Sequence, residues 1–321
     1  MILTVTVNPL LERRFTYKKI ISGGQNRYGV EELKAGGKGI NVSRQLNRLN
    51  VQNMAFMFLG GNNGKLLKDV LAQEGINFTF VRTGSETRNA VVTIDNSQNR
   101  VTTFFGQNSE ISQGEVNEFN SKLEKMIQNC EAVVFSGSSP CKATDSVFSL
   151  GISIANKYDK ISICDTYGDH LQECIESGPT IIHNNIDETE KSLKISLSSE
   201  KEKSDYLDFL YSKNIKQAYL TDGAKETHCS NFDYHFKVKI PEIEPGDSTG
   251  SGDSFVAGIA YGWHNNLTFE NSLLLASSLG TANAVTFDTS NVLLKEVEVF
   301  NNSISIQPIG KKMKIVNVSP G

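Results

Sequence analysis

The chain alternates between short runs of β-branched and apolar residues and longer segments in which apolar residues recur with a helical period. The short runs predict strands and the longer segments predict helices. The expected strands are Ala132–Phe135, Ile161–Cys164, Thr180–His183 and Gln217–Leu220, and the expected helices lie at about 114–129, 144–157, 168–176 and 200–213. This alternation indicates an α/β fold with a doubly wound, mainly parallel sheet and helices on both faces. Ligands of such sheets bind beyond the carboxyl ends of the strands.

One stretch departs from this alternation. Residues 89–94 and 101–105 have the pattern of two strands joined by a turn-rich loop, and residues 15–32 resemble strands without a covering helix. We expect a single domain over residues 1–321, with a small β-sheet lid formed by about 12–34 and 88–106. A hairpin fixed to the edge of the main sheet fits the pattern equally well. The tail over 303–318 alternates polar and apolar residues as a strand does, and suggests no function.

The composition narrows the class of protein. The 321 residues carry a formal net charge of −4, with 38% hydrophobic and 21% charged residues, which argues against a dedicated nucleic-acid binder. The sequence has no apolar run of about twenty residues and no signal peptide pattern at its start. Its five cysteines are scattered and form no CxxC pair. We therefore expect a cytoplasmic protein with neither nucleic acid nor membrane as a partner.

The segment Glu244–Ser254 has the features of an anion site. Gly250 and Gly252 allow a sharp turn and a close approach of backbone N–H groups to a ligand. An apolar stretch follows and predicts a buried helix, whose N-terminus favours phosphate. Asp253 is unusual there because a carboxylate repels phosphate. It has the placement of a general base that accepts a hydroxyl proton, and a helix-capping aspartate is the alternative.

Two common phosphate motifs are excluded. Phe255 stands where a dinucleotide-binding fingerprint needs its third glycine, and Lys38 is followed by Gly39 rather than by the Ser or Thr of a Walker A loop. A second glycine-rich segment, Gly36–Asn41, precedes a predicted helix. Asn41 offers both a donor and an acceptor to sugar hydroxyls, although many glycine-rich loops are only tight turns.

Together these segments resemble the two signatures of the PfkB family of carbohydrate kinases, which includes ribokinase and fructokinase. The signatures are Gly36-Gly37-Lys38-Gly39-Ile40-Asn41 and Asp247-Ser248-Thr249-Gly250-Ser251-Gly252-Asp253, and the similarity extends from Thr4 to about Asn291. The resemblance implies a ribokinase-like fold and ATP, Mg²⁺ and a monovalent cation as cofactors. It assigns catalysis to Asp253, with Gly250, Ser251 and Gly252 around the transferred phosphate.

Three further segments resemble the branch of the family that phosphorylates sugar phosphates, namely tagatose-6-phosphate kinase and 1-phosphofructokinase. These segments are Thr4–Pro9, Glu86–Asn89 and Ser136–Pro140. By this resemblance the substrate is a ketohexose phosphate, tagatose 6-phosphate or a fructose phosphate, which ATP converts to a bisphosphate. The implied substrate-binding residues are Glu12, Gly36, Gly37, Lys38, Asn41, Arg88, Ser138 and Arg27. Arg88, Ser138 and Arg27 would hold the phosphate already present.

The resemblance also implies a nucleotide side. Asn185 and Glu188 correspond to residues that support magnesium, which prefers oxygen ligands, and the implied cofactor-binding residues are Asn185, Thr221, Gly223, Gly250, Gly252 and Asn283. Family members often pair through their lids, so a homodimer is expected.

The chain departs from the family pattern at several places, which include Ser139 and Lys142 near the Ser136–Pro140 turn. Glu12 replaces an aspartate, His183-Asn184-Asn185 replaces Lys-Pro-Asn, and Thr221-Asp222-Gly223 replaces Ser-Leu-Gly. These departures keep two alternatives open. One is a ribokinase-like kinase of a neutral sugar or nucleoside. The other is a binding protein for sugar phosphate or nucleotide with weak or no turnover.

Overall fold

A large mixed sheet forms the centre of the protein, whose computed structural model describes residues 1–309. Its strand order is β14-β13-β12-β11-β10-β9-β8-β1-β4-β5. The seven strands from β11 to β5 run parallel, whereas β12, β13 and β14 extend the sheet antiparallel. The strands are β1 (Ile2–Thr6), β4 (Asn53–Gly60), β5 (Phe78–Thr83), β8 (Ala132–Gly137), β9 (Ile161–Thr166), β10 (Ile181–Asn185), β11 (Gln217–Thr221), β12 (Thr227–Asn231), β13 (Tyr234–Lys239) and β14 (Ser305–Ile309).

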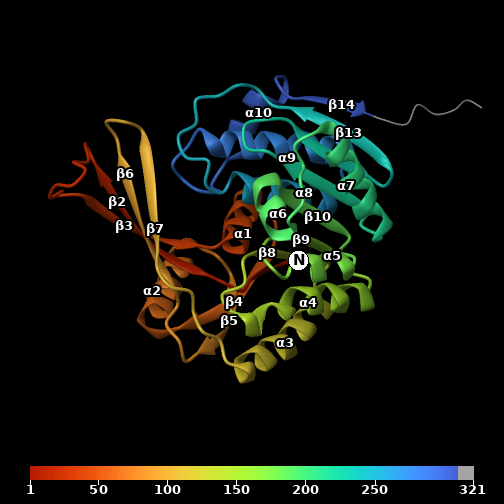
Figure 1. Cartoon of the computed structure of the whole chain (residues 1–321). Coiled ribbons are helices and arrows are strands. Elements are labelled where there is room, and N and C mark those ends of the chain that lie inside the picture. The colour runs from red at the N-terminus through yellow and green to blue at the C-terminus, as the bar shows by residue number, and fades with distance from the viewer. Residues whose placement is uncertain (310–321) are drawn as a thin grey trace, which may run out of the picture.

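Helices cover both faces of this sheet, as predicted (Figure 1). They are α1 (Lys38–Arg48), α2 (Gly61–Gln73), α3 (Gln113–Gln128), α4 (Ser146–Lys157), α5 (Leu171–Glu176), α6 (Ile186–Leu193), α7 (Glu200–Ser212), α8 (Ser251–His264), α9 (Phe269–Ala284) and α10 (Leu294–Asn301), with a short 3₁₀ turn at Lys142–Thr144. Successive strand residues point to opposite faces. Leu3 accordingly belongs to the apolar cluster that includes residues of α3, α4 and α7, whereas Ile2 belongs to the cluster that includes residues of α1, α8 and α9.

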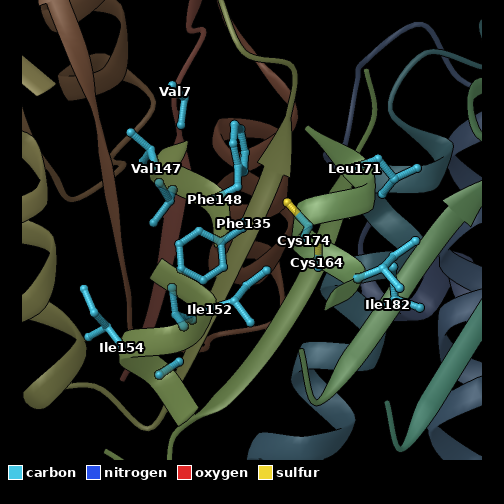
Figure 2. Close-up of a cluster of buried hydrophobic side chains, with 14 of the residues drawn as sticks. Val7, Phe135, Val147, Phe148, Ile152, Ile154, Cys164, Leu171, Cys174 and Ile182 are labelled. Atoms are coloured by element: carbon cyan, nitrogen blue, oxygen red, sulfur yellow. The ribbon is translucent and has the colours of Figure 1, made fainter. Parts of the chain in front are cut away.

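The apolar core under α4 and α5 fixes the neighbouring strands β8, β9 and β10. Figure 2 shows Phe135 of β8 and Phe148 of α4 in this cluster, with Cys164 of β9 and Ile182 of β10 nearby. All four side chains are fully buried. Burying one such side chain stabilises a fold by about 1.5–3 kcal/mol. The carboxyl ends of these three strands are therefore held rigidly, and they carry the site described below.

A second, four-stranded sheet stands beside the main body (Figure 1). Its order is β3-β2-β6-β7, with bounds β3 (Val30–Gly36), β2 (Leu10–Tyr17), β6 (Asn89–Asp95) and β7 (Arg100–Phe105). The predicted small sheet is thus confirmed. The predicted hairpin pairs with β2 rather than with an edge of the main sheet, because β6 runs parallel to β2 and antiparallel to β7.

The structure refines three other expectations. Strand-like residues 15–32 are interrupted after Tyr17 by a loop that turns at Gly23, where φ is 73°, and the chain becomes extended again at Val30. The helix expected from residue 168 begins at Leu171, since Gly168 has a φ of 108° that a helix does not accept. Of the strand-like tail over 303–318, the structure describes β14, and residues 310–318 lie outside the described part. Among residues 1–309, no helix has the length and apolar character needed to cross a bilayer.

Candidate active site

Four adjacent parallel strands end in polar side chains that contact one another. Ser136 of β8 donates to Asp165 Oδ2 over 2.5 Å, and His183 Nδ1 of β10 lies 2.9 Å from Asp165 Oδ1. The other ring nitrogen of His183 lies 3.1 Å from the hydroxyl of Thr221 on β11. Asp165 is buried at the centre of this network. Asp165 is not among the residues predicted from the sequence, although its position directly after the predicted strand Ile161–Cys164 is a usable signal.

The glycine-rich phosphate segment forms the start of α8. Gly250 is the residue before the helix and has a φ of 83°, a left-handed conformation that favours glycine. A Cβ atom at Gly250 would also collide with Thr289. The N–H groups of the first helical turn, including those of Gly252 and Asp253, have no acceptor within the helix. They are candidate donors to an anion, as the sequence predicted.

Asp253 lies in the first turn of α8 and is buried. Its Oδ2 atom accepts a hydrogen bond of 2.7 Å from Asn41 Nδ2 in α1. Burial raises the pKa of Asp253 to about 7, and the negative charge of Asp165 adds to the rise, while Lys38 and Asn41 oppose it. The bond to another helix, rather than to the start of its own, favours the base interpretation over the capping one. A carboxylate with a pKa near 7 suits proton transfer at neutral pH.

Lys38 belongs to the first glycine-rich segment and contacts the predicted magnesium residue Glu188. Its Nζ atom donates to Glu188 Oε2 over 2.9 Å and lies 3.7 Å from Asp165 Oδ1. Burial disfavours the ammonium form, but Asp165 and Glu188 outweigh this effect and hold the pKa of Lys38 above its usual value. The structure therefore places Lys38 among carboxylates, beside the predicted metal residue Glu188.

The predicted sugar residues lie around the start of α1. Gly37 precedes the helix with a φ of 118°, and a Cβ atom at Gly36 would lie 2.7 Å from Glu12 Oε1, so Glu12 rests directly on the glycine segment. Burial raises the pKa of Glu12, which the positive charge of Arg14 partly offsets. Arg44 donates to Asn41 Oδ1 over 2.7 Å and orients that side chain toward Asp253. Glu12 and Asn41 line one small cavity.

A separate group of donors gathers at the end of β1. Asn8 Nδ2 donates to Ser138 Oγ and to Asn108 Oδ1, each over 3.1 Å. Arg88 Nη2 donates to the carbonyl of Asn8 over 3.1 Å. Its Nε atom is buried without a partner among the described residues, and burial lowers the pKa of Arg88. The structure thus brings the predicted residues Arg88 and Ser138 together, and adds Asn8 and Asn108, which sequence reasoning had not assigned.

The structure does not bring Arg27 to this group. Arg27 lies exposed in the loop between β2 and β3, where it donates to Gln25. Arg88 directly precedes β6 at the other end of the small sheet, because Leu11 pairs with Asn89 at that end. At about 3.3 Å per residue, β2 separates the two arginines by roughly 20 Å.

The nucleotide-side residues take varied positions. Asn185 Oδ1 accepts from the N–H of Glu188 over 3.3 Å and caps α6. Gly223 follows β11 in an open turn with a φ of 54°. Asn283 is buried, and its amide donates to the carbonyl of Thr249 over 2.9 Å and to Ser251 Oγ over 3.1 Å. Asn283 therefore stabilises the backbone of the phosphate segment, and any effect of Asn283 on a nucleotide would be indirect.

Two other features lie away from this region. A surface groove of about 400 Å³ runs between α3 and α4, and its lining includes Glu124, Leu150 and Lys157. Glu200, Glu226 and His228 also lie close enough to share a metal ion. The ammonium of Lys237 already pairs with both glutamates of that group. Neither feature contains a residue that the sequence motifs singled out.

Comparison with known proteins places this geometry in context. Residues 13–295 match the sequence profile described as "pfkB family carbohydrate kinase". The tagatose-6-phosphate kinase of Staphylococcus epidermidis is 29% identical over 309 residues, which cover 93% of this chain and 99% of that protein.

Solved structures agree in fold. A Thermotoga maritima protein described as a possible 1-phosphofructokinase superposes with a TM-score of 0.88 at 21% identity, over 96% of this chain and 99% of that one. Phosphofructokinase-2 of Escherichia coli, in complex with substrates and products, gives a TM-score of 0.82 at 21% identity, over 94% of this chain and 98% of that one.

Proposed function

Since the chain belongs to the pfkB family of carbohydrate kinases, we propose that it transfers the γ-phosphoryl group of ATP to a hydroxyl of a ketohexose phosphate. The product is a bisphosphate, and tagatose 6-phosphate and the fructose phosphates are the candidate substrates, in keeping with the Staphylococcus epidermidis relative. One observation carries the proposal: the chain has both a buried carboxylate, Asp253, and a separate group of hydrogen-bond donors around Arg88, which suits a phosphate. A kinase of a neutral sugar has no need of the second feature.

Asp253 acts as the general base. Its Oδ1 atom accepts the proton of the attacking hydroxyl, while Asn41 holds Oδ2 over 2.7 Å and fixes the direction of the carboxylate. The hydroxyl oxygen then attacks the γ-phosphorus in line with the leaving oxygen of ADP. The backbone N–H groups of Gly250 and Gly252 stabilise the charge on the equatorial oxygens, which is the dominant contribution in phosphoryl transfer, whereas the N–H of Ser251 already donates to the carbonyl of Ser248 over 3.1 Å.

Arg88 and its neighbours hold the phosphate that the sugar already carries. The guanidinium supplies a permanent charge and a planar fork, and Ser138 and Asn8 add neutral donors beside it. Among residues 1–309, no atom accepts a hydrogen bond from the buried Nε atom of Arg88. Glu12 and Asn41, which line the adjoining cavity, orient the sugar hydroxyls.

The nucleotide side supplies oxygen ligands that fit magnesium. The carboxylate of Glu188 is one-third exposed and pairs with Lys38 over 2.9 Å, so the ammonium balances its charge when no metal is bound. Asn185 adds an amide oxygen in the same turn. Magnesium prefers such oxygen ligands together with waters and phosphates, and when bound it would neutralise the charge of the ATP phosphates. Thr221 and Gly223 border the nucleotide at the end of β11.

The small sheet acts as a lid, because one of its ends adjoins the site. Gly36 and Arg88 mark its end nearest the site, while β3 and β7 are its edges. Large apolar side chains are exposed on its edge strands, namely Val30, Phe104 and Phe105, and in the loop between β2 and β3, namely Ile21 and Tyr28. Exposed edges of this kind are usually covered, which supports a homodimer formed through the lid. The five cysteines are free thiols, in keeping with a reducing cytoplasm.

A direct assay tests the function. ADP release is measured with tagatose 6-phosphate, fructose 1-phosphate, fructose 6-phosphate and unphosphorylated fructose, in potassium and in tetramethylammonium buffers. The expected result is magnesium-dependent turnover on at least one sugar phosphate and a much lower kcat/KM on fructose. The two buffers test the expected monovalent cation. Equal turnover on fructose would indicate a neutral-sugar kinase, and tight sugar-phosphate binding without ADP release would indicate a binding protein.

A further inference from the structure

One buried arginine contacts three separate parts of the site. Arg14 of β2 has a side chain that is only 5% exposed. Its Nη1 atom donates to the carbonyl of Phe287 over 2.9 Å, and its Nη2 atom donates to Asp247 Oδ2 over 3.3 Å. Its Nε atom lies 3.6 Å from Glu12 Oε2. A single guanidinium therefore joins the sugar end of the small sheet to two loops of the main domain.

Both of these loops shape the phosphate segment. Asp247 is the first residue of the second glycine-rich signature, Asp247–Asp253, and its Oδ1 atom accepts from the N–H of Thr249 over 2.9 Å. Phe287 belongs to the loop that follows α9, in which Ser290 Oγ donates to the carbonyl of Gly250 over 3.1 Å. The contacts of Arg14 thus lead, through short hydrogen-bonded paths, to the backbone that would bind the transferred phosphate.

The electrostatics favour a fixed position for Arg14. A buried cation is costly unless it is paired and hydrogen-bonded, and here Glu12 and Asp247 provide two carboxylates. The planar fork of an arginine can bridge two acceptors, which a lysine ammonium does less well. The preceding residue, Arg13, points to the opposite face of the strand and pairs with Glu31 at the surface over 3.1 Å. It offers a matched comparison in the same strand.

We propose that Arg14 is a positioning residue of the kinase reaction, which couples the sugar-binding end of the small sheet to the phosphate segment. It acts through Glu12 on the sugar and through Asp247 and Phe287 on the anion-binding backbone. The inference rests on the proposed function. It adds a residue that neither glycine-rich signature contains.

Steady-state kinetics of Arg14→Met, Arg14→Lys and the control Arg13→Met test the proposal. Loss of charge-assisted hydrogen bonds is expected to lower kcat of Arg14→Met by about tenfold to a hundredfold. KM for the sugar phosphate should rise as well, since Glu12 loses its partner, whereas KM for ATP should change by less than about twofold. Arg14→Lys should lie between wild type and Arg14→Met, because it keeps the charge but not the fork. Arg13→Met should remain within about twofold of wild type.

A second readout separates positioning from general stability. Hydrogen exchange of the 246–251 backbone in the ligand-free protein should be faster in Arg14→Met than in Arg13→Met, with thermal unfolding recorded for both. If Arg14→Met does not fold, Asp247→Asn tests the same contact from the other side and should lower kcat similarly. Wild-type kcat in Arg14→Met or in a folded Asp247→Asn would overturn the proposal, as would equal kcat of the lysine and methionine variants. A wild type inactive on every sugar phosphate would instead refute the proposed function.

Discussion

Asn41 donates to the carboxylate of Asp253 over 2.7 Å, and so joins the helix that follows one glycine-rich segment to the helix that follows the other. The two residues are far apart in the sequence and come from α1 and α8. Arg44 Nη1 donates to Asn41 Oδ1 over 2.7 Å and so fixes the orientation of the Asn41 amide. The direction of the proposed base is therefore set by contacts between helices rather than by its own loop.

Replacement of Asp253 by asparagine should abolish most of the turnover. The amide has similar size but cannot accept the proton, and general-base catalysis contributes about 10²–10⁴ in rate. We expect kcat to fall by that factor, while the affinity for ATP, measured by equilibrium binding, changes little. Turnover within tenfold of wild type would remove Asp253 from the role of base.

Activity should rise with pH through about 7. The base must be deprotonated to act, and the pKa of Asp253 is raised to about 7 by burial and by Asp165. Asp165→Asn removes that negative charge, and it also leaves the positive charge of Lys38 less balanced. Both effects lower the pKa of Asp253. The midpoint of the kcat/KM profile should move to lower pH. Asp205→Asn, at an exposed helical ion pair, is the control, and an unshifted midpoint in Asp165→Asn would contradict the electrostatic account.

The opposite shift is expected for Asn41→Ala. The hydrogen bond from Asn41 stabilises the ionised carboxylate and lowers the pKa of Asp253 against the effect of burial. Its loss should move the same midpoint to higher pH, and a weaker grip on the sugar hydroxyls should also raise KM for the sugar. The pH profile is measured at saturating ATP beside that of Asp165→Asn. A shift of both variants in one direction would show that the network has been misassigned.

Arg88→Ala should raise KM for the sugar phosphate without a comparable change in KM for ATP. Loss of a charge-assisted contact to phosphate costs about 1.5–3 kcal/mol, or roughly tenfold to a hundredfold in KM. KM for ATP should remain within about twofold. Arg100→Ala is a suitable control, because Arg100 is exposed at the far end of the same sheet, opposite Asp95. An unchanged KM in Arg88→Ala would favour an unphosphorylated substrate.

Gly250→Ala should impair both stability and catalysis. The residue has a φ of 83°, which costs an alanine about 1–2 kcal/mol, and the added Cβ atom would collide with Thr289. The thermal midpoint should fall by several degrees and kcat should fall with it. Gly75→Ala is the comparison, since Gly75 has a φ of 68° but open space around it. Similar losses of kcat in the two variants would mean that the shape of the phosphate segment is not the cause.

The fold class and the two glycine-rich segments could be predicted from the amino-acid sequence alone. Both follow from local properties: the alternation of strands and helices is a matter of periodicity, and Gly250 is required by the backbone conformation of its own turn. The match of residues 13–295 to the pfkB family agrees with this local information. The carboxylate of Asp253 could be singled out for the same reason, because its place in a phosphate loop is visible without any contact.

Which side chains contact one another depends on the tertiary fold and could not be predicted from local patterns. Asp165 and Arg14 lie outside the glycine-rich signatures, yet one raises the pKa of the proposed base and the other bridges the phosphate segment to the small sheet. Lys38 is directed to Glu188 because α1 begins at Lys38 beside the edge of the main sheet where β10 ends and α6 begins. Arg27, which the sequence grouped with Arg88, lies at the opposite end of the small sheet. These relations depend on strand order and register, which residues distant in sequence set together and which no local pattern encodes.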